Sequence, residues 1–194
     1  MGNGNPEAYP FGEPLWLTRK KCSRNSVRGT ATLMAAEDKR GRQMFRGNHP
    51  AKVEENGRLK LPVPFKQLLD AANVTDLYVT SEDGKRAQIW PLGEWEKIEA
   101  QLAKHSTMND SVMRYLDLTS YYGQQVKMDA QGRIMLPQIL RSTARLEGDL
   151  VVMGKITHLE VVNRSAFEQD LPTGSLTSDD RRQVGGILAE GSKS

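Results

Sequence analysis

Two arginines stand at the same place in two nearly identical stretches of this chain. Residues 51–62 read AKVEENGRLKLP and residues 126–137 read VKMDAQGRIMLP, so Arg58 and Arg133 each follow a glycine at the end of a polar turn. Glycine can adopt the left-handed backbone conformation that such a turn needs, and the next side chain is then directed outward from the start of a strand. An outward guanidinium can bind a phosphate, or bond to O6 and N7 of guanine in the major groove. A single arginine in a hairpin is ordinarily a solvated surface residue, and the recurrence in both stretches is what favours binding.

Enzymatic and metal chemistry have little support in the same sequence. His49, His105 and His158 lie in separate segments without the spacing of metal ligands, and the single cysteine is Cys22. No phosphate-binding glycine loop and no nucleophile elbow is present in the sequence. We therefore expect a protein that is not an enzyme and uses neither a metal nor a cofactor.

The two stretches form an internal repeat with a spacing of 75 positions. A repeat of this kind determines the architecture, because each copy is one structural unit. The identical pairs are Lys52/Lys127, Gly57/Gly132, Arg58/Arg133, Leu61/Leu136 and Pro62/Pro137.

The elements around the repeated stretches come in matching order. Each copy predicts a hairpin, a short helix after the proline and then two more strands, because hydrophobic periodicity alternates between the strand and helix periods. The predicted ranges are 51–54, 58–61, 64–72, 76–80 and 86–90 in the first copy, and 125–128, 133–136, 138–145, 149–153 and 158–162 in the second. A helix follows each copy, starting near residues 92 and 164.

One copy has too few strands to bury both of its apolar faces, whereas two copies can interlock into one closed barrel with a pseudo-two-fold axis. The predicted fold class is α+β, mainly β, with short flanking helices. The predicted parts are a disordered basic extension at 1–43, repeat one at 44–96, a helical connector at 97–119, repeat two at 120–170 and a flexible tail at 171–194.

The repeated acidic turn, followed by Gly-Arg, a strand and Leu-Pro, resembles the MraZ family of bacterial transcriptional regulators, within the wider AbrB/SpoVT group. The resemblance covers about Met44 to Leu171 and includes the opening MFRG. It implies two AbrB-like repeats in a double-psi or swapped-hairpin barrel, and a ring-like homo-oligomer of eight to twelve subunits. It also implies a cytoplasmic, nucleoid-associated repressor that binds short direct repeats in double-stranded promoter DNA. The implied target is the division and cell wall gene cluster, including the protein's own promoter.

The resemblance also assigns roles to residues. Arg58 is the implied DNA-contacting arginine and Arg133 its counterpart. We add Lys52, Lys127 and Arg46 as predicted DNA contacts. The residues predicted to shape the two loops are Glu54, Gly57, Asp129 and Gly132. Glu54 departs from the family's preferred Asp, and its longer side chain is less suited to capping a tight turn.

The charge is unevenly placed along the chain, whose pI is about 9.0. Residues 1–43 hold eight basic and four acidic residues, whereas the segment from 44 to 170 has sixteen basic against seventeen acidic ones. Two interpretations of 1–43 stay open: Met44 is the true start, or the extension is a basic DNA-binding arm.

The sequence has no apolar run near 18 residues, so no membrane span is expected.

An antitoxin-like protein is the alternative function, because AbrB-type barrels also form the DNA-binding halves of toxin-neutralising proteins. Such proteins usually carry one motif copy and a long tail that wraps the toxin. Two copies and a short polar tail favour the regulator.

Overall fold

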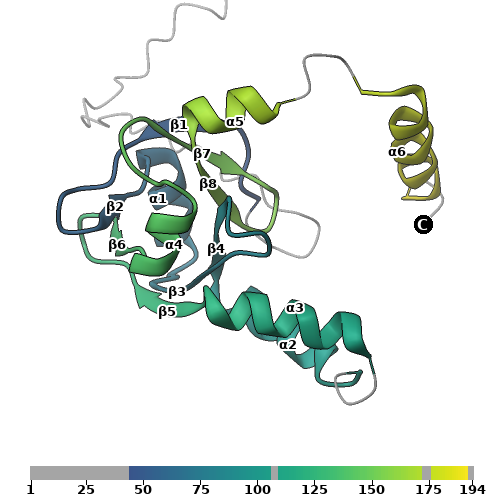
Figure 1. The fold of residues 1–194 in the computed structure, drawn as a ribbon, viewed down its shortest axis with the longest axis horizontal. Coiled ribbons are helices and arrows are strands. Elements are labelled where there is room, and N and C mark those ends of the chain that lie inside the picture. Colours follow the sequence, from purple (N-terminus) through teal and green to yellow (C-terminus); the bar gives the residue numbers. More distant parts are fainter. Residues whose placement is uncertain (1–43, 106–108, 172–175, 192–194) are drawn as a thin grey trace, which may run out of the picture. The chain divides into compact units, whose positions relative to one another are not determined.

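The computed structural model describes residues 44–105, 109–171 and 176–191 (Figure 1), so the predicted basic extension lies outside the described residues. The strands are β1 (Asn48–Ala51), β2 (Arg58–Lys60), β3 (Asp76–Thr80), β4 (Ala87–Pro91), β5 (Gln124–Lys127), β6 (Arg133–Met135), β7 (Leu150–Gly154) and β8 (Leu159–Asn163). The helices are α1 (Val63–Ala71), α2 (Leu92–Leu102), α3 (Asp110–Tyr121), α4 (Gln138–Thr143), α5 (Arg164–Asp170) and α6 (Ser178–Gly191). The α+β prediction is confirmed.

The strands form two antiparallel sheets that mix the two copies. A six-stranded sheet has the order β1-β7-β8-β4-β3-β5, and β2 pairs with β6 in a second sheet. The first strand of copy one, β1, pairs with β7 of copy two, with His49 opposite Val152. The equivalent strand of copy two, β5, pairs with β3 of copy one, with Leu77 opposite Val126. Each copy therefore completes the sheet of the other.

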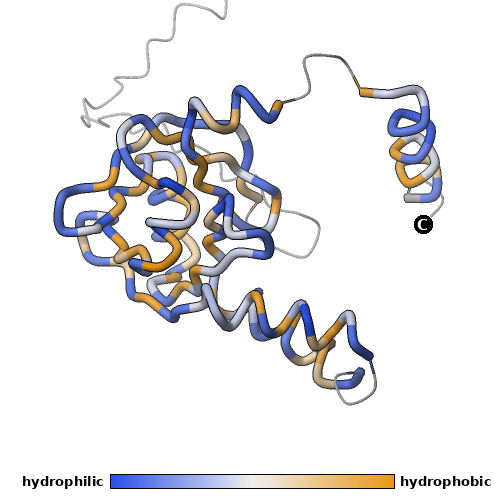
Figure 2. The backbone as a smooth tube through the Cα atoms, viewed as in Figure 1, coloured by the Kyte–Doolittle hydropathy of each residue, from blue (hydrophilic) through white to orange (hydrophobic). Residues whose placement is uncertain are grey.

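The core lies between these sheets and the two short helices that follow the motif strands. Leu59 of β2 and Ile134 of β6 are opposite each other and fully buried. Phe65 of α1 and Leu140 of α4 belong to the same buried apolar cluster. Full burial of one such side chain stabilises the fold by about 1.5–3 kcal/mol. In Figure 2 hydrophobic stretches of the tube recur along the strands.

The helices α1 and α4 begin directly after Pro62 and Pro137, whose fixed φ suits the residue before a helix. The two helices differ in length by about one turn. The N–H of Val74 closes α1 by donating to the carbonyl of Leu69, while that of Leu146 closes α4 by donating to the carbonyl of Arg141. The spacing between copies falls from 75 to 72 across this point, so the sequence prediction for α4, 138–145, ran two residues too far.

The helices α2 and α3 follow copy one, and α2 is anchored by Trp95. The Trp95 ring stacks on Tyr78 at 4.7 Å between centroids and lies 5.9 Å from Trp90, which ties α2 to β3 and β4. Helix α3 starts at Asn109, whose side chain accepts hydrogen bonds from the N–H groups of Ser111 and Val112. This is a strong N-terminal cap.

Helix α6 lies in the segment for which the sequence predicted a flexible tail, and the sequence did not predict this helix. Its apolar side chains Val184, Ile187 and Leu188 are exposed. Within the described ranges, no helix is both long and apolar enough to cross a membrane.

Candidate nucleic-acid interface

The ribbon formed by β2 and β6 presents a basic outer face. Its register pairs Arg58 with Met135, Leu59 with Ile134 and Lys60 with Arg133. Side chains directly opposite each other in an antiparallel pair lie on the same face, and alternate residues face opposite ways. Because the central pair is buried in the core, the other four side chains face outward, and three of them are basic.

Loop one, residues 54–58, is a tight turn that places Arg58 at its end. Gly57 has φ +82° and donates its N–H to the carbonyl of Glu54 at 2.8 Å. The side chain of Asn56 accepts a hydrogen bond from the N–H of Arg58 at 3.1 Å. The Arg58 side chain is exposed, as the sequence predicts.

Loop two, residues 129–133, repeats this turn but is capped by its acidic residue. The Asp129 carboxylate accepts hydrogen bonds from the N–H of Arg133 at 2.8 Å and of Gln131 at 2.9 Å. The bond from the Arg133 N–H is the main reason that the pKa of Asp129 lies below its usual value, and the charges of Arg133 and Arg58 lower it further. Asp129 therefore shapes its own loop in the manner predicted for both acidic positions.

Glu54 behaves differently from its counterpart Asp129. Its Oε1 accepts a hydrogen bond from Nε of Arg133 at 2.8 Å, which joins loop one to loop two in an ion pair. Arg133 is consequently only partly exposed, whereas the sequence predicted that its guanidinium points outward from the start of the strand. Its predicted contact with DNA stays a prediction.

Two further basic side chains pack on the loops, and each comes from the other copy. A Cβ added to Gly57 would lie 2.6 Å from Cζ of Arg141 on α4, and one added to Gly132 would lie 2.7 Å from Cδ of Lys66 on α1. We name Arg58 and Arg141 the loop-one patch, and Arg133 and Lys66 the loop-two patch. The sequence reasoning missed Arg141 and Lys66, although they too are separated by 75 positions.

This geometry can be compared with known proteins. A family model described as "MraZ protein, putative antitoxin-like" matches residues 123–184. A protein of Acidobacterium capsulatum, named transcriptional regulator MraZ, is 50% identical over 141 residues, which are 73% of this chain and 97% of that protein. The chain belongs to the MraZ family. A relative with the same name from Koribacter versatilis is 39% identical over 142 residues, covering 73% of this chain and 97% of that protein, and one from Neisseria meningitidis is 29% identical over 129 residues, covering 66% and 85%.

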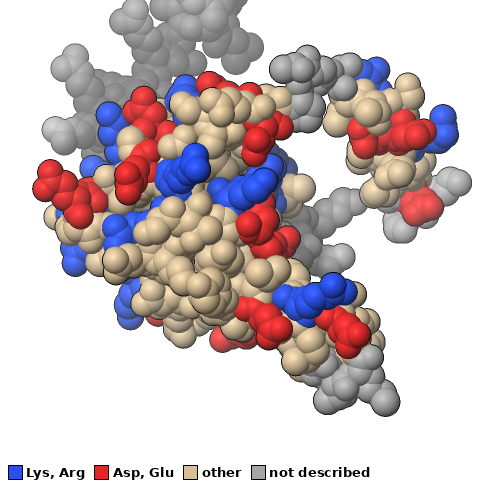
Figure 3. All heavy atoms as spheres, in the orientation of Figure 1, with Lys and Arg blue, Asp and Glu red and all other residues tan. Residues whose placement is uncertain are grey.

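The other predicted contacts of this MraZ-family chain are exposed and belong to neither patch. Lys52 forms an ion pair with Asp149 at 3.6 Å and lies near loop one, since it lines a surface pocket together with Glu54 and Lys60. Lys127 stands on β5 opposite Asp76, and the backbone of Arg46 lies against Gly154 at the end of β7. The structure thus brings Arg58, Arg133 and Glu54 together and leaves these three basic residues outside the loops. On the face shown in Figure 3, basic and acidic side chains are interspersed, which agrees with the near-neutral charge of residues 44–170.

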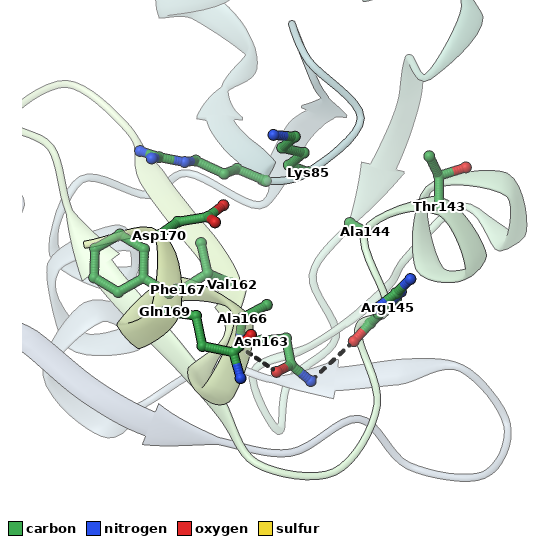
Figure 4. Close-up of a pocket in the computed structure, with 11 residues that line it drawn as sticks. Lys85, Thr143, Ala144, Arg145, Val162, Asn163, Ala166, Phe167, Gln169 and Asp170 are labelled. Carbon is green, nitrogen blue, oxygen red and sulfur yellow. Dashed lines mark hydrogen bonds between the residues drawn. The ribbon is translucent and has the colours of Figure 1, made fainter. Parts of the chain in front are cut away.

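A pocket of about 340 Å³ lies elsewhere in the chain, between the β3–β4 turn, the end of α4 and α5 (Figure 4). Its Arg86 guanidinium lies over the Phe167 ring at 5.5 Å and 3.6 Å from the buried Glu160 carboxylate. The Asn163 amide donates to the carbonyls of Arg145 and Glu147, both at 3.1 Å. These side chains bind one another and the backbone across the pocket walls, so their contacts are explained by the stability of the fold.

Among the residues that the structure describes, no group of three or more His, Cys, Asp or Glu side chains is placed to hold a metal ion.

Proposed function

We propose that this chain is a DNA-binding transcriptional regulator whose contact surface is the outer face of the β2–β6 ribbon and its loops. The observation that carries the proposal is the set of three basic side chains on that face, with Arg58 exposed at the tip of loop one. A two-stranded antiparallel ribbon fits the major groove of B-DNA, where an arginine can bond bidentately to guanine. The name of the relatives, transcriptional regulator, supports the same function.

Within this proposal the basic residues divide into base contacts and phosphate contacts. Arg58 bonds to a base edge or to a phosphate at the centre of the interface. Lys60, on the same strand, contacts the DNA backbone. Lys52, Lys127 and Arg46 are peripheral phosphate contacts. Phosphate contacts set affinity and register, while base contacts give specificity.

We infer that the two sheets close into one swapped-hairpin barrel built from two AbrB-like repeats. The exchange of β1 and β5 between copies supports this, as do two reciprocal hydrogen bonds. The N–H of Leu61 donates to the carbonyl of Gly132 at 2.8 Å, and that of Leu136 donates to the carbonyl of Gly57 at 3.2 Å. A closed barrel would hold both loops on one rigid support, and closure leaves no open sheet edge.

The proposal extends to the regulated genes and the assembly, for which the family resemblance is the support. We propose that the protein represses the division and cell wall gene cluster, its own promoter included, as a ring-like homo-oligomer in the cytoplasm and on the nucleoid. Head-to-tail contacts in a ring repeat one orientation, so they match direct repeats in DNA better than palindromes.

An antitoxin-like role is the second candidate, and α6 is the feature that favours it. This helix exposes Val184, Ile187 and Leu188, and the match to the model described as antitoxin-like reaches residue 184. A toxin partner would bury that apolar side. A toxin gene beside this gene, and a complex of the two products on gel filtration, would favour this candidate.

The regulator proposal is tested by measuring the affinity of the full chain for the DNA upstream of its own reading frame. A shuffled duplex of the same length and composition is the control. We expect at least a tenfold preference for the natural duplex, since specific binding commonly exceeds non-specific binding by about 10³ or more. Equal affinity for both duplexes would refute the proposed function.

A further inference from the structure

The two loop patches differ in ion pairing although the two loops occupy the same place in the repeat. In the loop-two patch, Arg133 pairs with Glu54 at 2.8 Å and Lys66 pairs with Asp70 at 2.5 Å. In the loop-one patch, neither Arg58 nor Arg141 forms an ion pair with any residue that the structure describes. Two separate ion pairs thus engage both cations of the loop-two patch, whereas both cations of the loop-one patch stay outside any such pair, with the exposed Glu55 as a further carboxylate of loop one.

The first ion pair results from a difference of one methylene group. Asp129 is short, and its carboxylate is held by the N–H groups of its own loop. Glu54 is longer and reaches Arg133 across the ribbon, while Asn56 takes over the capping of loop one. The pKa of Asp129 is lowered chiefly by the hydrogen bond from the Arg133 N–H and least by the charge of Arg58, and the side chains of Arg58 and Asp129 form no ion pair.

The second ion pair has no counterpart in copy two. Lys66 has Asp70 four residues later on α1. The residue four positions after Arg141 is Arg145, which follows the end of α4 at Thr143, so Arg141 has no carboxylate at the corresponding place. Arg141 instead donates from Nε to the carbonyl of Leu136 at 3.2 Å, a contact that leaves its positive charge uncompensated.

We propose that Glu54 and Asp70 mask loop two, so that each chain docks on DNA through loop one alone. Glu54 and Asp70 are positioning residues: they hold Arg133 and Lys66 away from phosphates. Arg141 is a further DNA contact beside Arg58. This inference rests on the proposed function, and it replaces the sequence prediction that Arg58 and Arg133 act alike.

Masking has a direct effect on salt dependence, because each phosphate that a cation neutralises adds about 0.9 to the slope of log affinity against log salt concentration. A cation held by a carboxylate releases fewer counterions when DNA binds. One reading loop per chain also means that one subunit reads one short DNA element, with the second element left to a neighbouring subunit.

The test uses the full chain and removes only the two masking carboxylates. The variants are Glu54→Gln, Asp70→Asn and the two combined, and each is measured on a random-sequence duplex at several salt concentrations. The matched control is Glu94→Gln, which removes the acidic partner of Lys97 in the exposed pair on α2. All variants lose negative charge, but only the first three free a cation at the loops.

We expect the combined variant to bind random DNA about fivefold or more tightly at low salt, with a slope steeper by about 1 to 2. Glu94→Gln should move neither quantity comparably. The double variant Glu54→Gln/Arg133→Ala should lose the tighter binding to random DNA that Glu54→Gln shows alone. In the otherwise natural chain, Arg133→Ala should weaken promoter binding much less than Arg58→Ala, and thermal melting must show that each variant is folded.

An unchanged slope in the folded combined variant would overturn masking. Equal losses from Arg133→Ala and Arg58→Ala on promoter DNA would do the same while leaving the regulator function intact. Failure of the natural chain to prefer its own upstream DNA would instead count against the proposed function.

Discussion

At the scale of single residues, the two acidic positions of the motif have separated in role. Asp129 caps its own loop, and Glu54 binds the arginine of the other loop. The repeated pattern was enough to predict the tight turns at Gly57 and Gly132 and the capping by Asp129, because these features depend on local sequence. The contact of Arg58 with DNA stays a prediction. The contacts of Glu54, Lys66 and Arg141 could not be predicted, because they depend on how the two copies interlock, and local spacing carries no information on that.

The capping by Asp129 predicts a pH-dependent stability. Its pKa is lowered in the folded chain, so its contribution to stability is present above the unfolded pKa of about 3.9 and is lost as the pH falls through the folded value. Asp129→Ala should therefore lower the melting temperature at pH 7, and the difference from the natural chain should vanish in strong acid. Melting curves between pH 7 and pH 2 measure this.

Measurements of DNA binding distinguish a local role of Asp129 at the interface from a general loss of stability. Asp129→Ala should also weaken promoter binding, because Gly132 of loop two accepts a hydrogen bond from the N–H of Leu61, directly after the strand that carries Arg58. Asp180 is hydrogen-bonded to Thr177 before α6, and its pKa is likewise lowered by those hydrogen bonds. Asp180→Ala should leave promoter affinity unchanged, and a matching loss of affinity in both variants would contradict the account of Asp129.

At the scale of elements, the helix of each copy supports the loop of the other. Arg141 of α4 covers Gly57, and Lys66 of α1 covers Gly132. The strand and helix order was predictable from periodicity, and β3 was predicted with its exact bounds. The hairpins predicted at 51–54/58–61 and 125–128/133–136 were wrong, because β1 pairs with β7, β5 with β3, and β2 with β6, and these partners lie far apart in the sequence. The early end of α4 was missed because the repeat spacing changes there.

Gly57→Ala tests the support of loop one by α4. Alanine at φ +82° strains the backbone by about 1–2 kcal/mol, and its Cβ would displace the Arg141 guanidinium. We expect a lower melting temperature together with weaker promoter binding, measured by thermal melting and fluorescence anisotropy.

The matched control is Gly148→Ala. Gly148 also has a positive φ, +68°, but an added Cβ would meet nothing within 4 Å. It should reduce stability to a similar degree and leave DNA affinity unchanged. Unaltered DNA affinity in Gly57→Ala would show that the contact with Arg141 has no part in binding.

At the scale of the whole molecule, one chain carries two copies of the motif but a near-neutral charge over residues 44–170. A single loop-one patch should therefore bind one DNA element weakly, in the range of about 10⁻⁴ to 10⁻⁶ M at physiological salt. Tight binding to the promoter then requires that several subunits of one assembly contact several DNA elements at once. The sequence predicted the repeat, and the regulatory assembly stays a prediction because it depends on surfaces between chains.

The phasing of DNA elements tests that assembly. We expect strong binding to several upstream repeats in natural phase, with a gain from avidity of roughly 10² to 10⁴ over one repeat. Shifting the repeats by about 5 bp, half a helical turn, should remove most of the gain. Equal affinity for single and phased repeats, compared by gel shift, would rule out cooperative docking.

The central claim is that Arg58 on loop one contacts DNA, and the most direct test is the affinity of Arg58→Ala for the natural upstream duplex. Arg114→Ala is the control, because Arg114 is an exposed arginine on α3, outside both loop patches. We predict that Arg58→Ala loses about 1–3 kcal/mol of binding free energy at an unchanged melting temperature, while Arg114→Ala binds as the natural chain does. An Arg58→Ala protein that melts normally and binds the duplex with natural affinity would contradict the claim.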